Sequence, residues 1–370
     1  MPLLDIAFYI FVVVVVVQVV YYLFIFSKFA FLKPKKATQK DIAVSILICA
    51  KNEAENLNKN LPFILNQEYP KFEVLLINDD SQDDTLSVME TYAAQYNNVK
   101  MVNVARNDRF LGSKKYALTL GIKASKHNFL LLTDADCKPN SKYWLKEMSS
   151  HFSNTKTIVL GYGAYAKIEN SFLNKLIRFE TVLTALQYFS FSKSGIPFMG
   201  VGRNLAYRKD LFFNANGFQN HMQIPSGDDD IFINQVASKE NTTICFSKNS
   251  FTISNPKTTF KDWLTQKRRH ISTAKHYKSI HKTLLALFYI SQFLFWFLSI
   301  TFVLTLFKWQ LVLPLIGIRF LIFFIIFSET SKKLNEKDLI LFLPFLEFFL
   351  IGTQLAIFIT NLLTKPKHWK

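Results

Sequence analysis

Apolar residues are concentrated at the two ends of the chain, and a segment of mixed apolar and polar residues lies between them. Near the N-terminus, residues 6–26 form an apolar run without a charged side chain. At about 1.5 Å per residue, a helix of this length crosses the roughly 30 Å hydrocarbon core of a bilayer. A cleaved signal peptide would need a basic N-terminal segment and a small-residue cleavage site, and the sequence has neither. We therefore expect an uncleaved membrane anchor over residues 1–27.

Basic residues follow this anchor at once, beginning with Lys28 and continuing to Lys40. Lys and Arg beside a membrane span are retained on the cytoplasmic side. The pattern predicts a multi-pass protein of the cell membrane with an external N-terminus and a cytoplasmic domain over residues 28–283. That segment is long enough to form one large domain with its own core.

A second apolar region, residues 284–370, predicts further membrane helices. Residues 284–307 and 311–328 are each long enough to cross a bilayer, and Lys308 marks a tight turn between them. A polar loop is expected over residues 329–338.

The last apolar stretch, residues 339–363, is a less regular candidate span because it contains Pro344, Glu347 and Gln354. A third crossing in this region would put the basic tail, residues 365–370, outside the cell, against its charge. A hairpin or an interfacial helix is the alternative. The sequence leaves a choice between two and three C-terminal membrane helices.

Between the membrane regions, apolar runs typical of strands alternate with helical patterns. Strands are predicted over residues 42–50, 72–78, 99–104 and 128–133, and helices over residues 53–67, 84–96 and 118–126. Near-continuous apolar strands are typical of a sheet buried on both faces. The alternation predicts an α/β fold with a parallel sheet between helices, in which ligands bind beyond the carboxyl ends of the strands.

Polar clusters follow three of the four predicted strands at their carboxyl ends. The clusters are Lys51-Asn52-Glu53, Asp79-Asp80-Ser81 and Asp134-Ala135-Asp136. Because the carboxyl ends of parallel strands share one edge of a sheet, we expect these clusters to converge there.

The carboxylates of Asp134 and Asp136 are separated by one residue and follow a buried strand. Two unpaired carboxylates at this distance repel each other, and a divalent cation relieves that repulsion. Mg²⁺ is held in proteins by one or two carboxylates together with substrate phosphates. A solvated acidic turn is the alternative, but the position at a strand end favours a site for a metal and a phosphate.

Other acidic residues have both structural and functional interpretations. Asp79 is a candidate for binding a ligand hydroxyl or base edge, whereas Asp83 or Asp84 is expected to cap the next helix. The adjacent carboxylates from Asp228 to Asp230 suit a helix N-terminus, and one of them could accept a proton from an acceptor hydroxyl.

A basic segment, Gln266-Lys267-Arg268-Arg269-His270, precedes the second apolar region. It fits a basic flank of a membrane span. It fits a diphosphate clamp equally well, because Arg presents a fork of donors to phosphate.

The formal net charge of +17 raises the question of nucleic-acid binding. Lys and Arg flank the apolar runs, however, where anionic lipid attracts them, and no helix-turn-helix, zinc-finger or RNP pattern is present. The three cysteines lack CxxC spacing, which fits a reduced compartment and argues against a zinc site. We expect a lipid bilayer, and no nucleic acid, as a partner.

Together these motifs resemble the family 2 glycosyltransferases of GT-A fold, from about Val44 to His270. The resemblance is carried by VSILICAKNEAENL, INDDSQDDT, LLTDADC, GRNLAYRK, SGDDDIF and QKRRH. In order, they are similar to the family's first strand, its VDDGSTDDT segment, its DxD motif, its GxNxAxR segment, its acidic ED pair and the QxxRW of processive members. Departures are Asn78 and Asp80, in place of an Asp and a Gly, and His270, in place of the Trp.

The resemblance implies a mixed, mostly parallel GT-A sheet and an inverting sugar transfer that uses Mg²⁺ or Mn²⁺. Asp136 would bind the metal, Asp134 the ribose or a metal-bound water, and Asp79 the nucleoside. Asp229 would be the base that deprotonates the acceptor. Further candidates are Gln266 and Arg269 on the donor diphosphate, Lys114 (similar to a family GKxxAL segment, with a surface lysine as the alternative), and Glu53, Asp228, Asp230 and Asn204.

The implied activity is transfer from a nucleotide-sugar, taken as a UDP-sugar, to a lipid-linked or glycan acceptor at the cytoplasmic membrane face. His270 favours this single addition over a processive polysaccharide synthase of the poly-N-acetylglucosamine or hyaluronan kind. A non-catalytic membrane assembly module is a third alternative, which the intact acidic motifs disfavour. The sequence leaves the donor sugar, the acceptor and the oligomeric state open.

Overall fold

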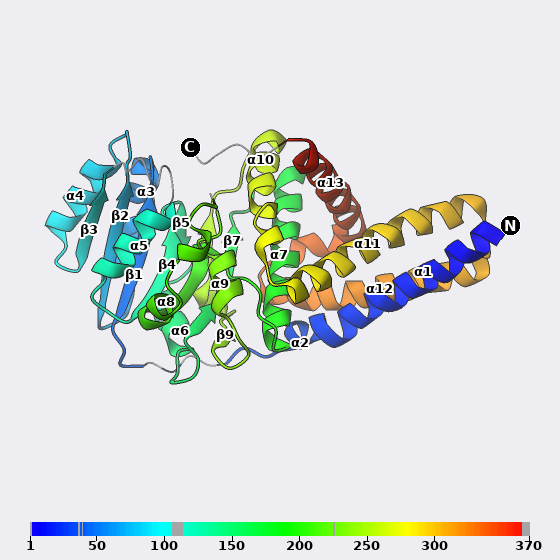
Figure 1. The fold of residues 1–370 in the computed structure, drawn as a ribbon, viewed down its shortest axis with the longest axis horizontal. Coiled ribbons are helices and arrows are strands. Elements are labelled where there is room, and N and C mark those ends of the chain that lie inside the picture. The colour runs from blue at the N-terminus through cyan, green and yellow to red at the C-terminus, as the bar shows by residue number, and fades with distance from the viewer. Residues whose placement is uncertain (1, 36–37, 39, 106–113, 225, 365–370) are drawn as a thin grey trace.

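The computed structural model describes residues 2–35, 38, 40–105, 114–224 and 226–364. Figure 1 shows an α/β body, formed by the elements from β1 to α10, and a bundle of long helices that projects from one side of it.

A mixed, mostly parallel sheet forms the centre of the body. Its order is β3-β2-β1-β4-β8-β6-β9. The bounds are β1 Val44–Ala50, β2 Phe72–Asp79, β3 Val99–Val104, β4 Phe129–Asp134, β6 Ile158–Leu160, β8 Leu205–Arg208 and β9 Thr242–Ile244. Strands β1 to β4 are parallel, and β8 runs antiparallel to both β4 and β6.

This strand order positions two parts of the chain beside each other. Because β1 lies between β2 and β4, the segments that follow these three strands meet at one edge of the sheet. Because β8 is antiparallel to β4, with Leu205 opposite Leu132, the residues that enter β8 lie beside the carboxyl end of β4.

A small second sheet begins directly after β4. It consists of β5 Cys137–Pro139, β10 Thr252–Ser254 and β7 Gly163–Tyr165, with β10 in the middle. Strands of three residues carry no measurable periodicity, so the sequence did not predict them.

Helices cover both faces of the main sheet. The bounds are α3 Ala54–Leu65, α4 Thr85–Gln95, α5 Lys114–Ala124, α6 Trp144–Ser150, α7 Phe172–Lys193, α8 Lys209–Asn214, α9 Asp230–Val236 and α10 Phe260–Ile271, with short 3-10 turns at Gly202–Asn204, Gln219–His221, Lys248–Ser250 and Ala274–His276. Successive residues of β1 enter opposite cores: Leu47 packs in one cluster with Leu118 of α5, and Ile46 packs in the other with Leu57 of α3.

The predicted strands and helices are present, with shifted ends. The strand predicted from residue 42 begins at Val44, and the helix predicted over residues 53–67 is Ala54–Leu65. The helix predicted over residues 118–126 instead begins at Lys114 and ends at Ala124. The charged first turn of that helix lay outside the prediction because its lysines are held by partners that the sequence pattern does not reveal.

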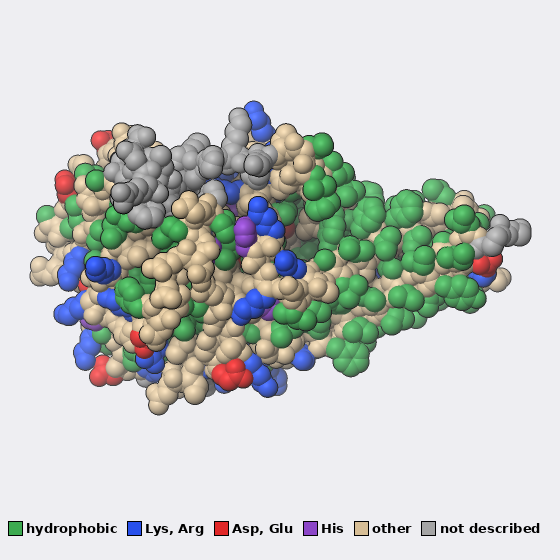
Figure 2. All heavy atoms as spheres, in the orientation of Figure 1, with side chains coloured by type: hydrophobic (Ala, Val, Ile, Leu, Met, Phe, Trp, Pro, Cys, Tyr) green, Lys and Arg blue, Asp and Glu red, His purple; other side chains and the backbone are tan. Residues whose placement is uncertain are grey.

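Outside the body, the described residues contain four helical segments that are long and apolar enough to cross a membrane, at Leu3–Ala30, Ser279–Thr305, Trp309–Lys333 and Lys337–Leu363. The first comprises α1 Pro2–Val20, a π-helical turn at Tyr21–Phe26 and α2 Ser27–Ala30; the others are α11 Ser279–Thr305, α12 Trp309–Lys333, and the 3-10 helix η7 Lys337–Phe342 with α13 Leu343–Leu363. Figure 2 shows that apolar side chains cover the projecting bundle.

The tight turn predicted at Lys308 is confirmed, since α11 ends and α12 begins on either side of it and Lys308 has a φ of 47°. The loop predicted over residues 329–338 is largely wrong, because α12 continues to Lys333. Several of its polar residues are paired within the helix: Lys332 pairs with Glu329 at 2.6 Å, and Thr330 donates a hydrogen bond to the Ile326 carbonyl.

Candidate functional site

The loops that follow β1 and β2 are joined by hydrogen bonds. The Asn52 backbone N–H donates to the Ser81 hydroxyl at 3.0 Å, and the Gln82 N–H donates to the Asn52 side chain at 2.8 Å. The Glu53 N–H donates to the Thr85 hydroxyl at 2.8 Å. Asn52 has a φ of 56°, a left-handed conformation that Asn tolerates better than most residues. The first two polar clusters therefore meet, as predicted.

Asp79 and Asp83 have different positions in this pair of loops. Asp79 is the buried last residue of β2, and burial raises its pKa. Asp83 accepts hydrogen bonds from the N–H groups of Ala54 and Thr85 at the starts of α3 and α4, so its expected capping role is confirmed. Asp84 makes no side-chain capping bond.

The carboxylates that follow β4 form a compact group with Cys137. One ligand atom each from Asp134, Asp136 and Cys137 lies within 4.8 Å of the others. Burial raises the pKa of Asp136, and the negative charge of Asp134 raises it further. Burial also raises the pKa of Cys137 well above its usual value, so it stays a neutral thiol. The oxygen pair therefore fits a hard divalent cation, whose positive charge would relieve the repulsion between Asp134 and Asp136.

Glu53 belongs to the same acidic neighbourhood. Burial raises its pKa, and the charges of Asp136 and Asp134 add to that effect. Asn56, one turn into α3, donates a hydrogen bond to the Glu53 carboxylate at 2.6 Å and fixes its orientation. The cluster after β1 thus reaches the carboxylates after β4.

Lys114 connects the carboxylates after β4 with the later acidic triplet. Its Nζ lies 2.7 Å from Asp134 Oδ1 and 3.2 Å from Asp228 Oδ2, and its side chain is only 20% exposed. Burial alone would lower the pKa of Lys114, but these two negative charges raise it well above its ordinary value. The alternative of a surface lysine is wrong: Lys114 lies between two acidic segments of the site.

The outer members of the triplet have separate partners. Burial would raise the pKa of Asp228, but the Lys114 ammonium lowers it below its usual value. Asp230 is buried, and its carboxylate accepts hydrogen bonds from the hydroxyls of Tyr277, at 2.7 Å, and Thr273. Asp230 therefore ties α9 to the segment before α11.

Asp229, the middle member, caps α9. Its Oδ1 accepts from the Asp230 N–H and its Oδ2 from the Gly202 N–H, both at 2.7 Å. Burial raises the pKa of Asp229 to about 8, and the charges of Asp228 and Asp230 contribute to the rise. Each carboxylate oxygen keeps a second lone pair, so the group can still accept a proton.

Arg269 brings positive charge to the same group. It lies in α10, where burial lowers its pKa and the charges of Asp228, Asp134 and Asp229 oppose that shift. Gln266 precedes it by three residues on the same helix, so both lie on one face of α10.

The recorded hydrogen bonds of the Asn204 side chain join segments of the body outside the acidic group. Asn204 is fully buried, its side-chain oxygen accepts from the Trp144 indole at 3.0 Å, and its amide nitrogen donates to the carbonyls of Tyr162 and Ser250 at 2.9 and 2.7 Å. Its hydrogen-bonding capacity is used to join segments beneath the site.

Arg203 was not singled out from the sequence, although it occupies the turn that enters β8. Its guanidinium lies 4.2 Å from the centre of the Tyr165 ring and donates to the Ala164 carbonyl at 3.0 Å and the Ser254 hydroxyl at 2.8 Å. Its charge opposes the rise that burial causes in the pKa of the half-buried Asp136. Only the antiparallel pairing of β4 and β8, which the sequence did not predict, brings it there.

Comparison with known families agrees with this arrangement. Residues 131–330 match "Glycosyl transferase family group 2", and residues 45–213 match "Glycosyl transferase family 2". The chain therefore belongs to the family 2 glycosyltransferases, as the motifs predicted.

Particular relatives cover parts of the chain. Glycosyltransferase AglE of Haloferax volcanii is 31% identical over 193 residues, which is 50% of this chain and 58% of that protein. Poly-beta-1,6-N-acetyl-D-glucosamine synthase of Staphylococcus epidermidis is 31% identical over 123 residues, or 33% of this chain and 29% of the synthase. The matched regions thus span less than two thirds of either relative.

A solved structure resembles most of the chain. It is the mannosyltransferase PcManGT of Pyrobaculum calidifontis in complex with GDP-Man and Mn²⁺, with a TM-score of 0.59 at 16% identity, covering 90% of this chain and 99% of PcManGT. At this identity the likeness concerns the fold, and it confirms the predicted GT-A architecture.

Proposed function

We propose that this protein transfers a sugar from a nucleotide-sugar to a lipid-linked or glycan acceptor at the cytoplasmic face of the cell membrane, with inversion at the anomeric carbon. One observation carries the proposal: Lys114 joins the Asp134–Asp136 pair to the acidic triplet that contains Asp229. A site for a charged donor and a candidate base are therefore adjacent in a chain of family 2.

The donor side of the proposed site combines acidic and basic groups. Asp136 and Asp134 would hold Mg²⁺ or Mn²⁺, which when bound would neutralise the departing diphosphate. A GT-A relative in complex with Mn²⁺ and GDP-Man supports a divalent metal and a nucleotide-sugar. Asp79 would bind the nucleoside, and Arg269, with Gln266 beside it, would add hydrogen bonds and charge to the diphosphate.

The acceptor side depends on Asp229. The acceptor hydroxyl would give its proton to an Asp229 oxygen while the hydroxyl oxygen attacks the sugar C1 and the bond to the diphosphate breaks. Attack opposite the leaving group inverts the anomeric carbon. A pKa raised to about 8 by burial suits a general base, which works best when its pKa lies near the operating pH.

The apolar helices and the charge pattern support a membrane location. We divide the chain into an anchor over residues 1–27, a transferase domain over residues 28–283 and a membrane region over residues 284–370. Basic side chains occur on the body and beside the base of the bundle, while the bundle surface is apolar (Figure 2). This distribution supports a cytoplasmic domain, because Lys and Arg are retained on that side.

The test uses the full-length protein in detergent or nanodiscs, radiolabelled UDP-sugars and GDP-sugars in turn, Mn²⁺ or Mg²⁺, and a membrane lipid extract. We expect metal-dependent labelling with one donor. Asp136→Asn should abolish it, whereas Asp41→Asn, at an exposed ion pair with Lys71, should not. Absence of transfer from every donor would favour the non-catalytic assembly module.

A processive polysaccharide synthase is the second candidate, because one relative is named as a poly-N-acetylglucosamine synthase. Size analysis of the labelled product separates the two activities. A short, lipid-extractable product supports single addition, and a long polymer contradicts it.

A further inference from the structure

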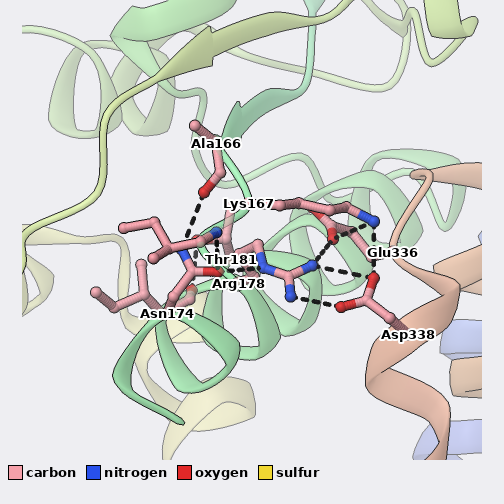
Figure 3. Close-up of polar contacts among 9 residues, drawn as sticks. Ala166, Lys167, Asn174, Arg178, Thr181, Glu336 and Asp338 are labelled. Carbon is pink, nitrogen blue, oxygen red and sulfur yellow. Dashed lines mark hydrogen bonds and ion pairs between the residues drawn. The ribbon is translucent and has the colours of Figure 1, made fainter. Parts of the chain in front are cut away.

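The segment Lys337–Leu363 begins in contact with the α/β body. Arg178 of α7 is buried, and its guanidinium pairs with Asp338 Oδ2 and Glu336 Oε2, each at 2.5 Å. Lys167 lies 2.7 Å from Asp338 Oδ1. Figure 3 shows Arg178 and Lys167 converging on both carboxylates, with Asn174 holding the Arg178 side chain from the same helix. The start of the segment is therefore fixed to the body.

The other end of this segment also contacts the body. Arg268 of α10 donates from Nε to the Asn361 side chain and from Nη2 to the Thr364 carbonyl, both at 2.8 Å. Asn361 donates in return to the Arg268 carbonyl at 3.2 Å. The end of α13 is thus fixed beside the helix that carries Gln266 and Arg269.

The other long helices define the opposite end of the bundle. Asp5, near the start of α1, pairs at 2.6 Å with Lys308 in the turn between α11 and α12. This distal tip lies far from the body, whereas α13 runs back towards α10 (Figure 1). A fourth crossing would need one end of Lys337–Leu363 at the tip, but both of its ends meet the body.

Between its two ends, the segment reaches into the bundle. Glu347, near the start of α13, is buried and pairs with Arg319 of α12 at 2.5 Å. Trp296 and Gln292 of α11 donate to Glu347 at 3.2 and 2.9 Å. Arg319 precedes the end of α12, Lys333, by 14 residues, which is about 21 Å at 1.5 Å per residue. Phe327 of α12 still stacks on Phe179 of the body, so the Glu347–Arg319 pair lies about 12 Å farther into the bundle than this contact.

We propose that Lys337–Leu363 is a re-entrant segment that enters the bilayer from the side of the body, reaches the Glu347–Arg319 pair and returns to the same side. A charged side chain at membrane depth is tolerated when it faces the bundle and is paired, as Glu347 is. Phe345 and Phe349 pack on Phe172 of α7 and Phe348 packs on Trp296 of α11, but all three rings stay partly exposed and supply an apolar face for lipid.

Two consequences follow from this topology. Among the described residues, three segments then cross the membrane: Leu3–Ala30, α11 and α12. Thr364 then lies on the same side as the body, which agrees with the Lys residues that follow it in the sequence, because positive charge is retained on the cytoplasmic side. The inference concerns the path of the chain and does not depend on the transfer activity.

Labelling of introduced cysteines in intact cells tests the proposal. Thr364→Cys reports the end of the segment, Lys275→Cys the body side, and Leu306→Cys the distal tip; all three positions are exposed. The parent chain, with Cys49, Cys137 and Cys245, gives the background. Each variant is treated with a membrane-impermeant maleimide before and after permeabilisation. We expect Thr364→Cys to label with Lys275→Cys, after permeabilisation only, and Leu306→Cys to label in both conditions.

The comparison does not depend on which side the body occupies, since Thr364→Cys is scored against two references in the same chain. Labelling of Thr364→Cys together with Leu306→Cys, and apart from Lys275→Cys, would overturn the proposal. Identical labelling of the two references would also overturn it, because α11 would then not cross. If a cysteine variant fails to accumulate, alkaline phosphatase and green fluorescent protein fused after Lys370 decide the same point, with fluorescence and no phosphatase activity expected for an internal C-terminus.

Discussion

At the residue scale, three consecutive carboxylates have three different partners. Asp228 pairs with Lys114, and Asp229 accepts hydrogen bonds from two backbone N–H groups. Asp230 accepts hydrogen bonds from two hydroxyl groups in the segment that precedes α11. Without such partners, the repulsion between adjacent negative charges would destabilise the folded protein. Among the described residues, the structure records no ion pair and no hydroxyl donor for Asp229, which supports its proposed role as the base.

Replacement of Asp229 by Asn tests that assignment. We expect Asp229→Asn to lower kcat by about 10²–10⁴, the usual contribution of a general base, while donor binding is kept. Asp230→Asn should instead lower thermal stability, because its carboxylate is a buried hydrogen-bond acceptor. Turnover and nucleotide affinity are measured on both variants. Wild-type turnover by Asp229→Asn, with loss in Asp228→Asn, would move the role to Asp228.

The pH dependence of kcat/KM provides a second check at this scale. A base acts only when deprotonated, so activity falls as the pH falls through the pKa of Asp229. Burial and the adjacent carboxylates raise that pKa to about 8. The acid limb is therefore expected between the ordinary value for Asp, about 3.9, and about 8. Asp228→Asn removes one neighbouring charge and should shift the limb to lower pH. An acid limb at the same pH in Asp228→Asn as in the wild type would show that the Asp228 charge does not raise the pKa of Asp229.

At the element scale, the turn that enters β8 positions the proposed base. The Gly202 N–H donates to Asp229, and a Cβ added at Gly202 would lie 3.3 Å from Asp229 Oδ2. We expect Gly202→Ala to displace the carboxylate and lower kcat by about 10-fold, or roughly 1.4 kcal/mol in the barrier, with donor KM little changed. Gly352→Ala is the control, because a Cβ there meets nothing within 4 Å. Equal effects of the two substitutions would contradict this explanation.

The sequence predicted those elements whose pattern is long enough to read. The apolar runs gave β1 to β4, and their parallel pairing brought together the clusters around Glu53, Asp79 and Asp134. Strands of three or four residues could not be recognised, and one of them is the antiparallel β8, which brings Arg203 near Asp136. Long-range pairing, which is not encoded in local periodicity, decided the part that was missed.

Lys114 and Asn204 show the same difference between what local sequence patterns predict and what the tertiary fold decides. A motif indicated both residues, but only the tertiary fold shows that Lys114 lies between two carboxylates and that the Asn204 amide bonds to three other segments of the body. Sequence patterns thus identified which residues matter, and the packing of distant segments decided how each is used.

At the scale of the whole molecule, one buried polar network links all the long helices of the bundle. Arg319 of α12 pairs with Glu347 and donates to Gln18 of the first helix at 3.0 Å, while Gln292 of α11 donates to Glu347. The carboxylate that made the last apolar stretch irregular in sequence is therefore the partner of a buried arginine.

This pairing predicts an asymmetric response to substitution. Glu347→Gln leaves the buried Arg319 charge without a counterion and is expected to destabilise the protein by about 3–5 kcal/mol. The double variant Arg319→Met, Glu347→Gln removes the charge itself, so most of that loss should be recovered. Thermal unfolding in detergent measures both, with Asp41→Asn at the surface as the control. If the double variant is as unstable as the single one, the helices are held by packing around Arg319 and not by the charge pair.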